Sequence, residues 1–389
     1  MLSRRIAVLL ALGFSHAVTA QTGDESRVRA RDMGLAVGVM APGPRNAITD
    51  VPGVTVGQTT IIRGDSVRTG VTAVLPHAGN IYQEKVPGAI YLFNAFGKLA
   101  GYTQVAELGN IETPIVLTNT LNVGTGVLAT IKYILSQPEN DNVRSVNAVV
   151  GETNDGYLND IRGQHVTEQD VIAAIKSASS GSVAEGSVGA GTGTRALGYK
   201  GGIGTSSRLV ASATAGSYTV GVLVQSNFGR ELVINGVPFS RELHAQTSQE
   251  TQGSEEGSCM IVIATDAPLS PRNLLRLAKR SFSGMARTTT VMTNGSGDYA
   301  IAFSTAYHIP NDNAQELIVR PAEIANDDMN PFFQAVEEAT QEAIYNSIFM
   351  ATTVAGYHGH TVPAIPLGAV KRICEKYNML DLNERLPLR

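Results

Sequence analysis

Residues 244–269 read HAQTSQETQGSEEGSCMIVIATDAPL, and their character changes abruptly at Ser258. Residues 244–257 contain no strongly apolar side chain other than Ala245, and they predict a solvated segment without regular structure. The run CMIVIAT at 259–265 is almost continuously apolar, which is typical of a fully buried strand. The stretch therefore predicts a chain that passes directly from solvent into the core.

The junction between Gly257 and Ser258 is also a candidate for chemistry. A small, flexible glycine lets the Ser258 hydroxyl reach the carbonyl carbon of the preceding peptide. An N→O acyl shift there, followed by ester hydrolysis, would leave Ser258 as a new N-terminus. The free α-amine would have a pKa of roughly 7.7–8.0, low enough for it to act as its own general base. From these residues alone, a surface loop that enters a strand remains the alternative.

Several motifs in order along the chain resemble one family, the self-processing serine aminopeptidases. This family comprises the L-aminopeptidase/D-amidase/D-esterases and the β-peptidyl aminopeptidases. The likeness covers nearly everything after residue 30. Besides Gly257-Ser258, the motifs are IVIATDAPL (261–269), the basic helix expected up to Arg287, NGSGD (294–298), RNAITDVPGVTVG (45–57), VGETNDGYLND (150–160), VAEGSVGAGTG (183–193), KGGIGTSSR (200–208) and VGVLVQSNFG (220–229).

The resemblance implies a fold, an assembly and an activity. The fold would be a four-layer α/β/β/α sandwich, with two central sheets flanked by helices. Self-cleavage would divide the mature chain into residues 21–257 and 258–389, which together form one catalytic domain. Processed protomers would assemble as a tetramer. An acyl-enzyme on Ser258 would release N-terminal residues from short peptides, amides and esters, with Gly257 and Ser258 as the cleavage site.

Two acidic residues follow an apolar run at 148–150, where binding groups often lie. A carboxylate from Glu152 or Asp155 could hold a substrate ammonium, which an aminopeptidase needs to recognise an N-terminus. The alternative is an Asx-type turn with solvated charges. The resemblance assigns Glu152 to the substrate amine and Tyr157 to the active site of the L-aminopeptidase branch.

Three further polar residues are site candidates. Asn227 follows the apolar run at 220–225 and could donate its amide to an oxyanion, although an asparagine at that place is more often a turn former. Ser296 and Asp298 lie in a glycine-flanked segment expected to be a loop. By resemblance, Ser296 bonds the oxygen or the amine of the nucleophile, and Asp298 adjusts the protonation of the site. Some relatives have glutamate at the Asp298 position.

Apolar runs and helix-start signals predict an α+β fold. The pattern Thr167-Glu168-Gln169-Asp170 resembles a capping box that opens a helix to about residue 178. Pro271 opens an amphipathic helix that runs to about residue 287, and Asn330-Pro331 opens a third helix. A fourth is expected at 124–136. Strands are expected at 55–62, 72–75, 89–93, 115–117, 148–150, 219–225, 260–265 and 299–304.

The first twenty residues predict a cleaved export signal. Arg4 and Arg5 precede an apolar run at 6–14, and Val18 and Ala20 suit the positions before a signal-peptidase site. This pattern favours a periplasmic or secreted protein, with a cytosolic N-terminal helix as the alternative. The arginine pair also resembles a twin-arginine signal, so the export route stays open. No other run approaches the roughly 18 apolar residues of a membrane span, so the mature chain is not expected to contact a membrane.

Composition limits the classes of function. A chain of 389 residues that is 43% hydrophobic can bury a large core as one or two domains, and a net charge of −4 does not indicate a nucleic-acid partner. No cysteine or histidine spacing indicates a metal, and no cofactor is expected. The cluster at 358–360 is better explained by a loop before Pro363. Cys259 and Cys374 could pair in an oxidising compartment, but a position inside an apolar strand favours two buried thiols.

The same sequence also allows other functions. The GAGTG segment at 189–193 could cradle a phosphate, but no GxxxxGK[ST] motif is present, and tight turns near a buried site explain the glycines better. No GxSxG elbow supports a conventional serine hydrolase, although a triad is recognised in space rather than in sequence. Acyl transfer, as in the related fold of ornithine acetyltransferases, and a non-enzymatic glycine-rich binding protein remain alternatives to an aminopeptidase. The Tyr157 and Asp298 pattern favours the L-aminopeptidase branch, while the preferred acyl residue stays open.

Overall fold

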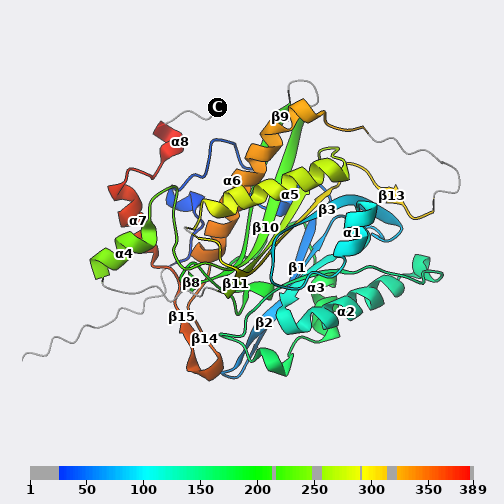
Figure 1. Cartoon of the computed structure of the whole chain (residues 1–389), viewed down its shortest axis with the longest axis horizontal. Helices are drawn as coiled ribbons and strands as arrows, with labels where there is room; N and C mark the ends of the chain where they lie inside the picture. Colours follow the sequence, from blue (N-terminus) through cyan, green and yellow to red (C-terminus); the bar gives the residue numbers. More distant parts are fainter. Residues whose placement is uncertain (1–25, 213–215, 248–255, 290, 313–321, 386–389) are drawn as a thin grey trace, which may run out of the picture.

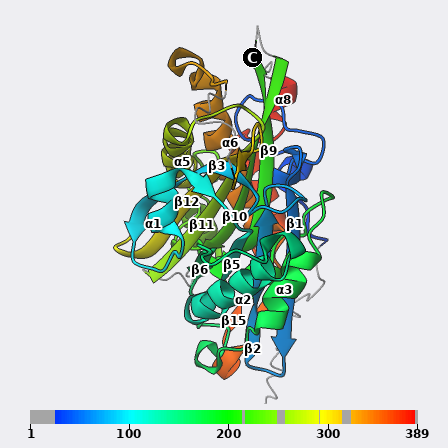
Figure 2. The same ribbon diagram turned by 90° about the vertical axis from the view of Figure 1, so that its right-hand side faces the viewer.

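Two mixed β-sheets face each other at the centre of the computed structural model, and helices pack on their outer faces (Figures 1 and 2). The structure describes residues 26–212, 216–247, 256–289, 291–312 and 322–385. The expected export signal at 1–20 lies outside the described residues, as does most of the polar segment before Gly257.

The larger sheet holds the junction between Gly257 and Ser258. Its strand order is β13-β3-β12-β11-β10-β9, with β4 paired to β3. Strands β11 and β12 run parallel, and the other pairs are antiparallel. The strands are β3 (Glu84–Ala95), β4 (Asn110–Ile111), β9 (Gly202–Ser212), β10 (Gly216–Asn227), β11 (Glu256–Thr265), β12 (Gly295–Ser304) and β13 (Ile309–Pro310).

The smaller sheet has the order β1-β2-β5-β6, and its last pair is parallel. It supplies one wall of the interior because β6 packs against β11. Its strands are β1 (Thr55–Arg63), β2 (Val67–Leu75), β5 (Ile115–Asn119) and β6 (Val149–Thr153); two short hairpins, β7 (Arg195–Ala196) with β8 (Tyr199–Lys200) and β14 (Val354–Ala355) with β15 (Thr361–Val362), lie outside both sheets.

Helices cover the two sheets from opposite sides (Figure 2). Helices α5 and α6 pack on the larger sheet, whereas α2 and α3 pack on the smaller one. The described helices are α1 (Tyr102–Leu108), α2 (Val123–Leu135), α3 (Glu168–Lys176), α4 (Phe239–Thr247), α5 (Pro271–Ala286), α6 (Asn330–Phe349), α7 (Leu367–Lys376) and α8 (Leu382–Arg385). Within the described part of the chain, none has the length and apolar character that crossing a bilayer requires.

Strand β11 is buried on both faces, as its continuous apolar sequence predicts. Ile261 and Ile263 belong to the core between the larger sheet and helices α5 and α6. Met260 and Val262 belong to the core between the two sheets. Because successive side chains of a strand point to opposite faces, β11 stabilises two cores at once.

The helices predicted from start signals in the sequence, and the two buried thiols, are confirmed. Thr167 accepts a hydrogen bond from the Asp170 amide, and the Asp170 carboxylate accepts one from the Thr167 amide, which caps α3 as the sequence predicts. Helices α5 and α6 begin at the expected prolines, Pro271 and Pro331, to within one residue. Cys259 and Cys374 are both free and buried.

The residues on either side of the polar segment differ from the sequence expectation. His244 lies in helix α4, so the polar segment begins as helix and not as irregular chain. Strand β11 begins at Glu256 rather than near residue 260, because the backbones of Glu256 and Gly257 pair with β12 whatever their side chains. A strand can therefore start before its apolar run does, and the junction lies inside the sheet.

A buried ion network joins α6 to β9. The guanidinium of Arg208, fully buried, contacts Glu338 at 3.2 Å (Nε–Oε2) and Glu342 at 2.6 Å (Nη2–Oε2). Arg31 contacts the same Glu342 carboxylate at 2.7 Å. Burial by itself raises the pKa of Glu342, but the charges of Arg208 and Arg31 outweigh it and hold the pKa below its usual value.

We expect Glu342→Gln to lower the free energy of unfolding by about 3–5 kcal/mol, because Arg208 would stay buried without one of its partners. The folded-state pKa of Glu342 is depressed, so its contribution is present above the unfolded pKa and is lost as the pH falls through the folded pKa. Urea unfolding of the native protein and of Glu342→Gln, from neutral pH down through the folded pKa of Glu342, measures the difference in stability. Glu337→Gln is the matched control: it breaks a partly exposed pair with Arg287 and should change stability by only about 0–1 kcal/mol. Equal losses in the two variants would contradict the assignment.

Candidate active site

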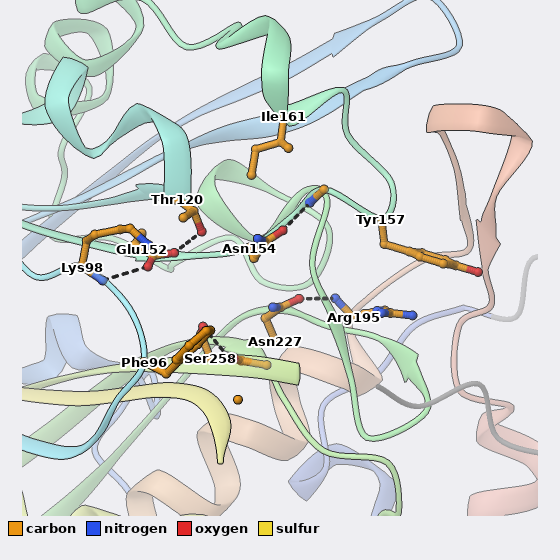
Figure 3. A pocket seen from close by; sticks show the side chains of 13 residues that line it. Phe96, Lys98, Thr120, Glu152, Asn154, Tyr157, Ile161, Arg195, Asn227 and Ser258 are labelled. Carbon is orange, nitrogen blue, oxygen red and sulfur yellow. Dashed lines mark hydrogen bonds between the residues drawn. The ribbon is translucent and has the colours of Figure 1, made fainter. Parts of the chain in front are cut away.

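A pocket of about 430 Å³ opens where the first residues of β11 meet the end of β6 (Figure 3). It brings together Glu152, Tyr157, Asn227, Gly257 and Ser258, which the sequence singled out. The remaining lining residues are Phe96, Lys98, Thr120, Asn154, Gly156, Ile161, Arg195 and Gly295.

Ser258 lies at the floor of this pocket, between two strands. Its register partners are Asn227 on β10 and Gly297 on β12. The residue is only 4% exposed, and its hydroxyl donates to the carbonyl oxygen of Gly257 at 2.6 Å. The hydroxyl thus lies beside the carbonyl group of the preceding peptide.

Gly257 leaves no room for a side chain. A Cβ atom at this position would lie 2.7 Å from the carbonyl oxygen of Asn227 and 2.7 Å from the Cα of Phe228. Both atoms belong to the backbone, which cannot move aside cheaply. The glycine therefore allows β10 to approach β11 closely at the junction.

Asn227 ends strand β10, where the sequence predicted it. Its Oδ1 atom accepts a hydrogen bond from the backbone amide of Arg195 at 3.0 Å. The side chain lines the pocket beside Ser258 (Figure 3). Because the oxygen accepts from Arg195, the nitrogen Nδ2 is the group of this side chain that can donate a hydrogen bond in the pocket.

Glu152 is a buried carboxylate in β6, not a solvated turn residue. It is 2% exposed, and its oxygens accept hydrogen bonds from the backbone amide of Lys98 at 3.0 Å and from the Thr120 hydroxyl. Burial raises the pKa of Glu152, and these hydrogen bonds oppose the rise. A carboxylate has about four lone-pair sites, so Glu152 can accept further bonds from a cation in the pocket.

Asp155 faces the interior and does not line the pocket. Its Oδ1 accepts from Asn159 Nδ2 at 2.9 Å, while Oδ2 is buried without a hydrogen-bond partner among the described residues. Burial raises the pKa of Asp155 to about 7. Of the two carboxylates considered for an ammonium, only Glu152 reaches the pocket.

Tyr157 forms part of an aromatic stack at the pocket wall. Its ring stacks on His360, with ring centroids 4.2 Å apart, and the Arg195 guanidinium lies 4.1 Å from the ring centroid. Two groups this close to one centroid must occupy opposite faces of the ring. The His360 Nδ1 atom also forms a hydrogen bond with the Tyr157 carbonyl oxygen at 2.9 Å, so this histidine holds both the ring and the backbone of Tyr157.

Ser296 and Asp298 lie in strand β12 and not in the expected loop. The Ser296 hydroxyl donates to Asp298 Oδ1 at 2.7 Å, and Asp298 Oδ2 is buried with no partner in the described part of the chain. Burial raises the pKa of Asp298 to about 6, although the Ser296 hydroxyl and the Cys259 amide lower it.

The register of β12 determines where these two residues lie relative to Ser258. Ser296 is the partner of Gly257, and Asp298 is the partner of Cys259. Paired residues share a face, so in the continuous chain both side chains lie on the face opposite to the Ser258 side chain. They are strand neighbours of Ser258 and do not line the pocket.

The glycine-rich segment at 189–193 uses its amides inside the fold. Gly189 N donates to Thr60 Oγ1 at 2.8 Å, and Ala190 N donates to Thr72 Oγ1 at 3.1 Å. A Cβ on Gly191 would lie 2.5 Å from a backbone nitrogen of β9. Close packing explains these glycines, and their bonded amides do not form a phosphate cradle.

Outside the pocket, His77, Glu84 and His308 bring possible metal-ligand atoms within 4.8 Å of one another. Both ring nitrogens of His77 already bond the backbone, to Gly79 N at 3.1 Å and to Glu84 O at 2.7 Å. The two imidazoles stack with centroids 4.4 Å apart, which directs their lone pairs into separate planes. This geometry suits a structural contact better than a metal centre.

Sequence reasoning missed several pocket residues, among them Phe96, Lys98 and Arg195. Phe96 and Lys98 follow β3, and Arg195 lies in a two-residue strand within the glycine-rich tract. No periodicity or motif distinguished them. A charged residue embedded among glycines, as at Arg195, was the one available signal.

The comparisons with known proteins agree on one family. The model of peptidase family S58 matches residues 46–362. The chain is 40% identical over 383 residues to the β-peptidyl aminopeptidase BapA of Sphingosinicella microcystinivorans, covering 90% of this chain and 93% of that protein.

Two solved structures share the fold. A Burkholderia sp. β-aminopeptidase has a TM-score of 0.83 at 36% identity, covering 90% of this chain and 99% of its own. The L-aminopeptidase D-Ala-esterase/amidase from Ochrobactrum anthropi has a TM-score of 0.84 at 37% identity with the same coverage. The latter is described as a prototype for the serine aminopeptidases and a new variant among the Ntn hydrolase fold. Two mixed sheets with flanking helices are therefore an Ntn-hydrolase-like arrangement.

We expect Ser296→Ala to raise the pKa of Asp298 above its value of about 6, because the variant loses a hydroxyl that stabilises the carboxylate. A carboxyl titration by ¹³C NMR measures the change, with Asp298→Asn identifying the signal. Ser304→Ala is the matched control, since its hydroxyl lies on the same strand but donates to Ala267 O at 2.6 Å. An unshifted pKa in Ser296→Ala would show that this hydrogen bond does not stabilise the carboxylate.

Proposed function

The chain belongs to peptidase family S58 and is a serine aminopeptidase of the β-peptidyl or L-aminopeptidase/D-amidase/esterase type, and we propose that Ser258 is its nucleophile. Its substrates are short peptides and amino-acid amides or esters, from which it releases the N-terminal residue. The observation that carries this proposal is the position of Ser258, beside the Asn227 amide in a pocket that also holds the buried Glu152 carboxylate.

The first step we propose is cleavage of the chain at its own junction. Ser258 Oγ attacks the carbonyl carbon of Gly257, the peptide C–N bond breaks, and an ester forms with a free amine on Ser258. Water then hydrolyses the ester, which leaves a carboxylate on Gly257 and restores the hydroxyl. The contact of 2.6 Å between this hydroxyl and the Gly257 carbonyl oxygen supports the step. The products are residues 21–257 and 258–389.

The new amine acts as the general base in substrate hydrolysis. It removes the Ser258 hydroxyl proton as Oγ attacks the substrate carbonyl carbon, and it returns that proton to the leaving amine. The Asn227 amide donates to the oxyanion, a contact typically worth about 10²–10³ in rate. Water hydrolyses the resulting acyl-enzyme ester and regenerates Ser258.

Ser296 and Asp298 support this amine from the neighbouring strand. Ser296 is the register partner of Gly257, and in this proposal its side chain reaches the nitrogen that the cut would free. Its proton is directed to Asp298, which leaves the Ser296 oxygen able to accept a hydrogen bond from the amine. In this proposal the pair orients the base and does not contact the substrate.

Glu152 recognises the substrate ammonium. A charge-assisted hydrogen bond in this buried position is about twice as strong as a neutral one. The proposal also includes export by residues 1–20 to the periplasm or the exterior, and a tetramer of processed protomers.

We expect Ser258→Ala to give one intact band on a denaturing gel and no peptidase activity, because it removes the hydroxyl that both steps need. The native protein should give two bands that purify together, with Ser258 at one N-terminus by sequencing. Ser270→Ala is the control, since this half-buried helix cap of α5 lies outside the pocket and should leave processing intact. Cleavage at Gly257 in purified Ser258→Ala would show that another protease makes the cut.

We expect Glu152→Gln to lower kcat/KM on free-amine substrates by about tenfold or more, while self-cleavage continues because it involves no substrate ammonium. The native enzyme should refuse N-acetylated substrates. Glu112→Gln is the matched control: it is also a buried glutamate, but it bonds the Asn147 amide outside the pocket. Equal native turnover of a free and an acetylated p-nitroanilide would remove Glu152 from this role.

A further inference from the structure

The pocket has the Glu152 carboxylate at one end and the Arg195 guanidinium at the other (Figure 3). In Figure 3, Ser258 and Asn227 lie between Glu152 on one side and the pair of Arg195 and Tyr157 on the other. The proposed function uses the carboxylate end and leaves the guanidinium end without a role. A cation that lines a peptidase pocket beyond the nucleophile lies on the path of the leaving group.

The fold holds Arg195 at this end by its backbone. Its amide donates to Asn227 Oδ1 at 3.0 Å, so the residue is tied to the strand end beside the nucleophile. It begins the short strand β7, which pairs with β8. The position of Arg195 relative to Ser258 is thus determined by main-chain contacts that survive replacement of its side chain.

The side chain of Arg195 is held by the aromatic stack. The guanidinium lies 4.1 Å from the Tyr157 ring centroid, and His360 supports the other face of this ring. A guanidinium that stacks by its face donates hydrogen bonds from its edge, in a fork that matches a carboxylate. Stacking also reduces the freedom that an arginine loses on binding.

The other cation that lines the pocket belongs to the opposite end. The backbone of Lys98 bonds Glu152, and its side chain is exposed. Lys98 therefore adds positive charge to the pocket without lying on the leaving-group side of Ser258 (Figure 3). Replacing Lys98 therefore serves as a control for the loss of a positive charge elsewhere in the pocket.

We infer that Arg195 binds the C-terminal carboxylate of the leaving portion of a peptide substrate, so that among peptides the enzyme prefers short ones with a free C-terminus. This rests on the proposed function, because it requires the scissile carbonyl at Ser258 and the ammonium at Glu152. A peptide extends at most about 3.3–3.6 Å per residue, so only short leaving portions place their carboxylate at Arg195. Arg195 is a specificity residue that contacts the substrate away from the reacting bond.

The test compares free acids with C-terminal amides. Dipeptides and tripeptides that share one N-terminal residue, chosen as the one released fastest from its p-nitroanilide, are prepared in both forms. For at least one length, the native enzyme should prefer the acid in kcat/KM by about tenfold or more. Arg195→Met should bring this acid-to-amide ratio close to one, and Arg195→Lys, which keeps the charge but lacks the fork, should give an intermediate ratio. Comparing ratios between proteins cancels the intrinsic difference between the two leaving groups.

Lys98→Met provides the matched control and should keep the native ratio, whatever it does to the rates. The inference is overturned if the native enzyme shows no acid preference at either length, if Arg195→Met keeps the native ratio, or if Lys98→Met abolishes it equally. Where Arg195→Met does not self-cleave, Arg195→Lys carries the comparison, and an acid-to-amide ratio in that variant equal to the native one overturns the inference. Failure of the native enzyme to hydrolyse the anilide and every peptide would instead refute the proposed function, and the inference with it.

Discussion

The pairing of β11 with a strand on each side is the constraint on which the pocket depends. Ser258 is the third residue of β11, which begins at Glu256. It pairs with Asn227 of β10 on one side and with Gly297 of β12 on the other. The close approach of β10 requires Gly257 to lack a side chain. Backbone pairing, rather than the conformation of a loop, thus places the proposed nucleophile beside its proposed oxyanion donor. A site on paired strands is held more precisely than one on a loop.

Burial acts differently on the carboxylates of this protein according to what lies beside them. Glu342 is fully buried, yet two guanidinium groups hold its pKa below the usual value. Glu152 and Asp298 are buried with hydrogen-bond donors but without an adjacent guanidinium, and burial raises both pKa values. The ion pairs of Glu342 stabilise its ionised form, which joins α6 to β9. Among the described residues, Glu152 is influenced by the charge of Lys98 but has no guanidinium partner, and a substrate ammonium can add a further countercharge.

The sequence predicted those parts of the molecule whose side chains reveal their environment. Strand β11, the cap of α3 and the starts of α5 and α6 carry local signals, and the structure follows them. Strand β9 carries none, because its glycines are selected for close backbone contact and not for an alternating apolar face. Arg195 and Phe96 reach the pocket through tertiary contacts between distant segments, which no window of sequence can show. Ser296 and Asp298 were found by resemblance, but their placement in a strand depends on a parallel pairing that spans the helix α5.

The order of the larger sheet has a consequence for the lifetime of a cut molecule. Strand β12 and nearly all of β11 belong to the segment that begins at Ser258. In the sheet they lie between β3 and β10, which belong to the preceding segment. A cut at the junction would leave two polypeptides interleaved within one sheet, each closing the edges of the other. Neither could depart by sliding off an edge, because both flanking ladders and both adjoining cores would have to open together. Exchange of fragments between cut molecules would then require global unfolding, so a cut enzyme would retain the two pieces of the single chain from which it was made.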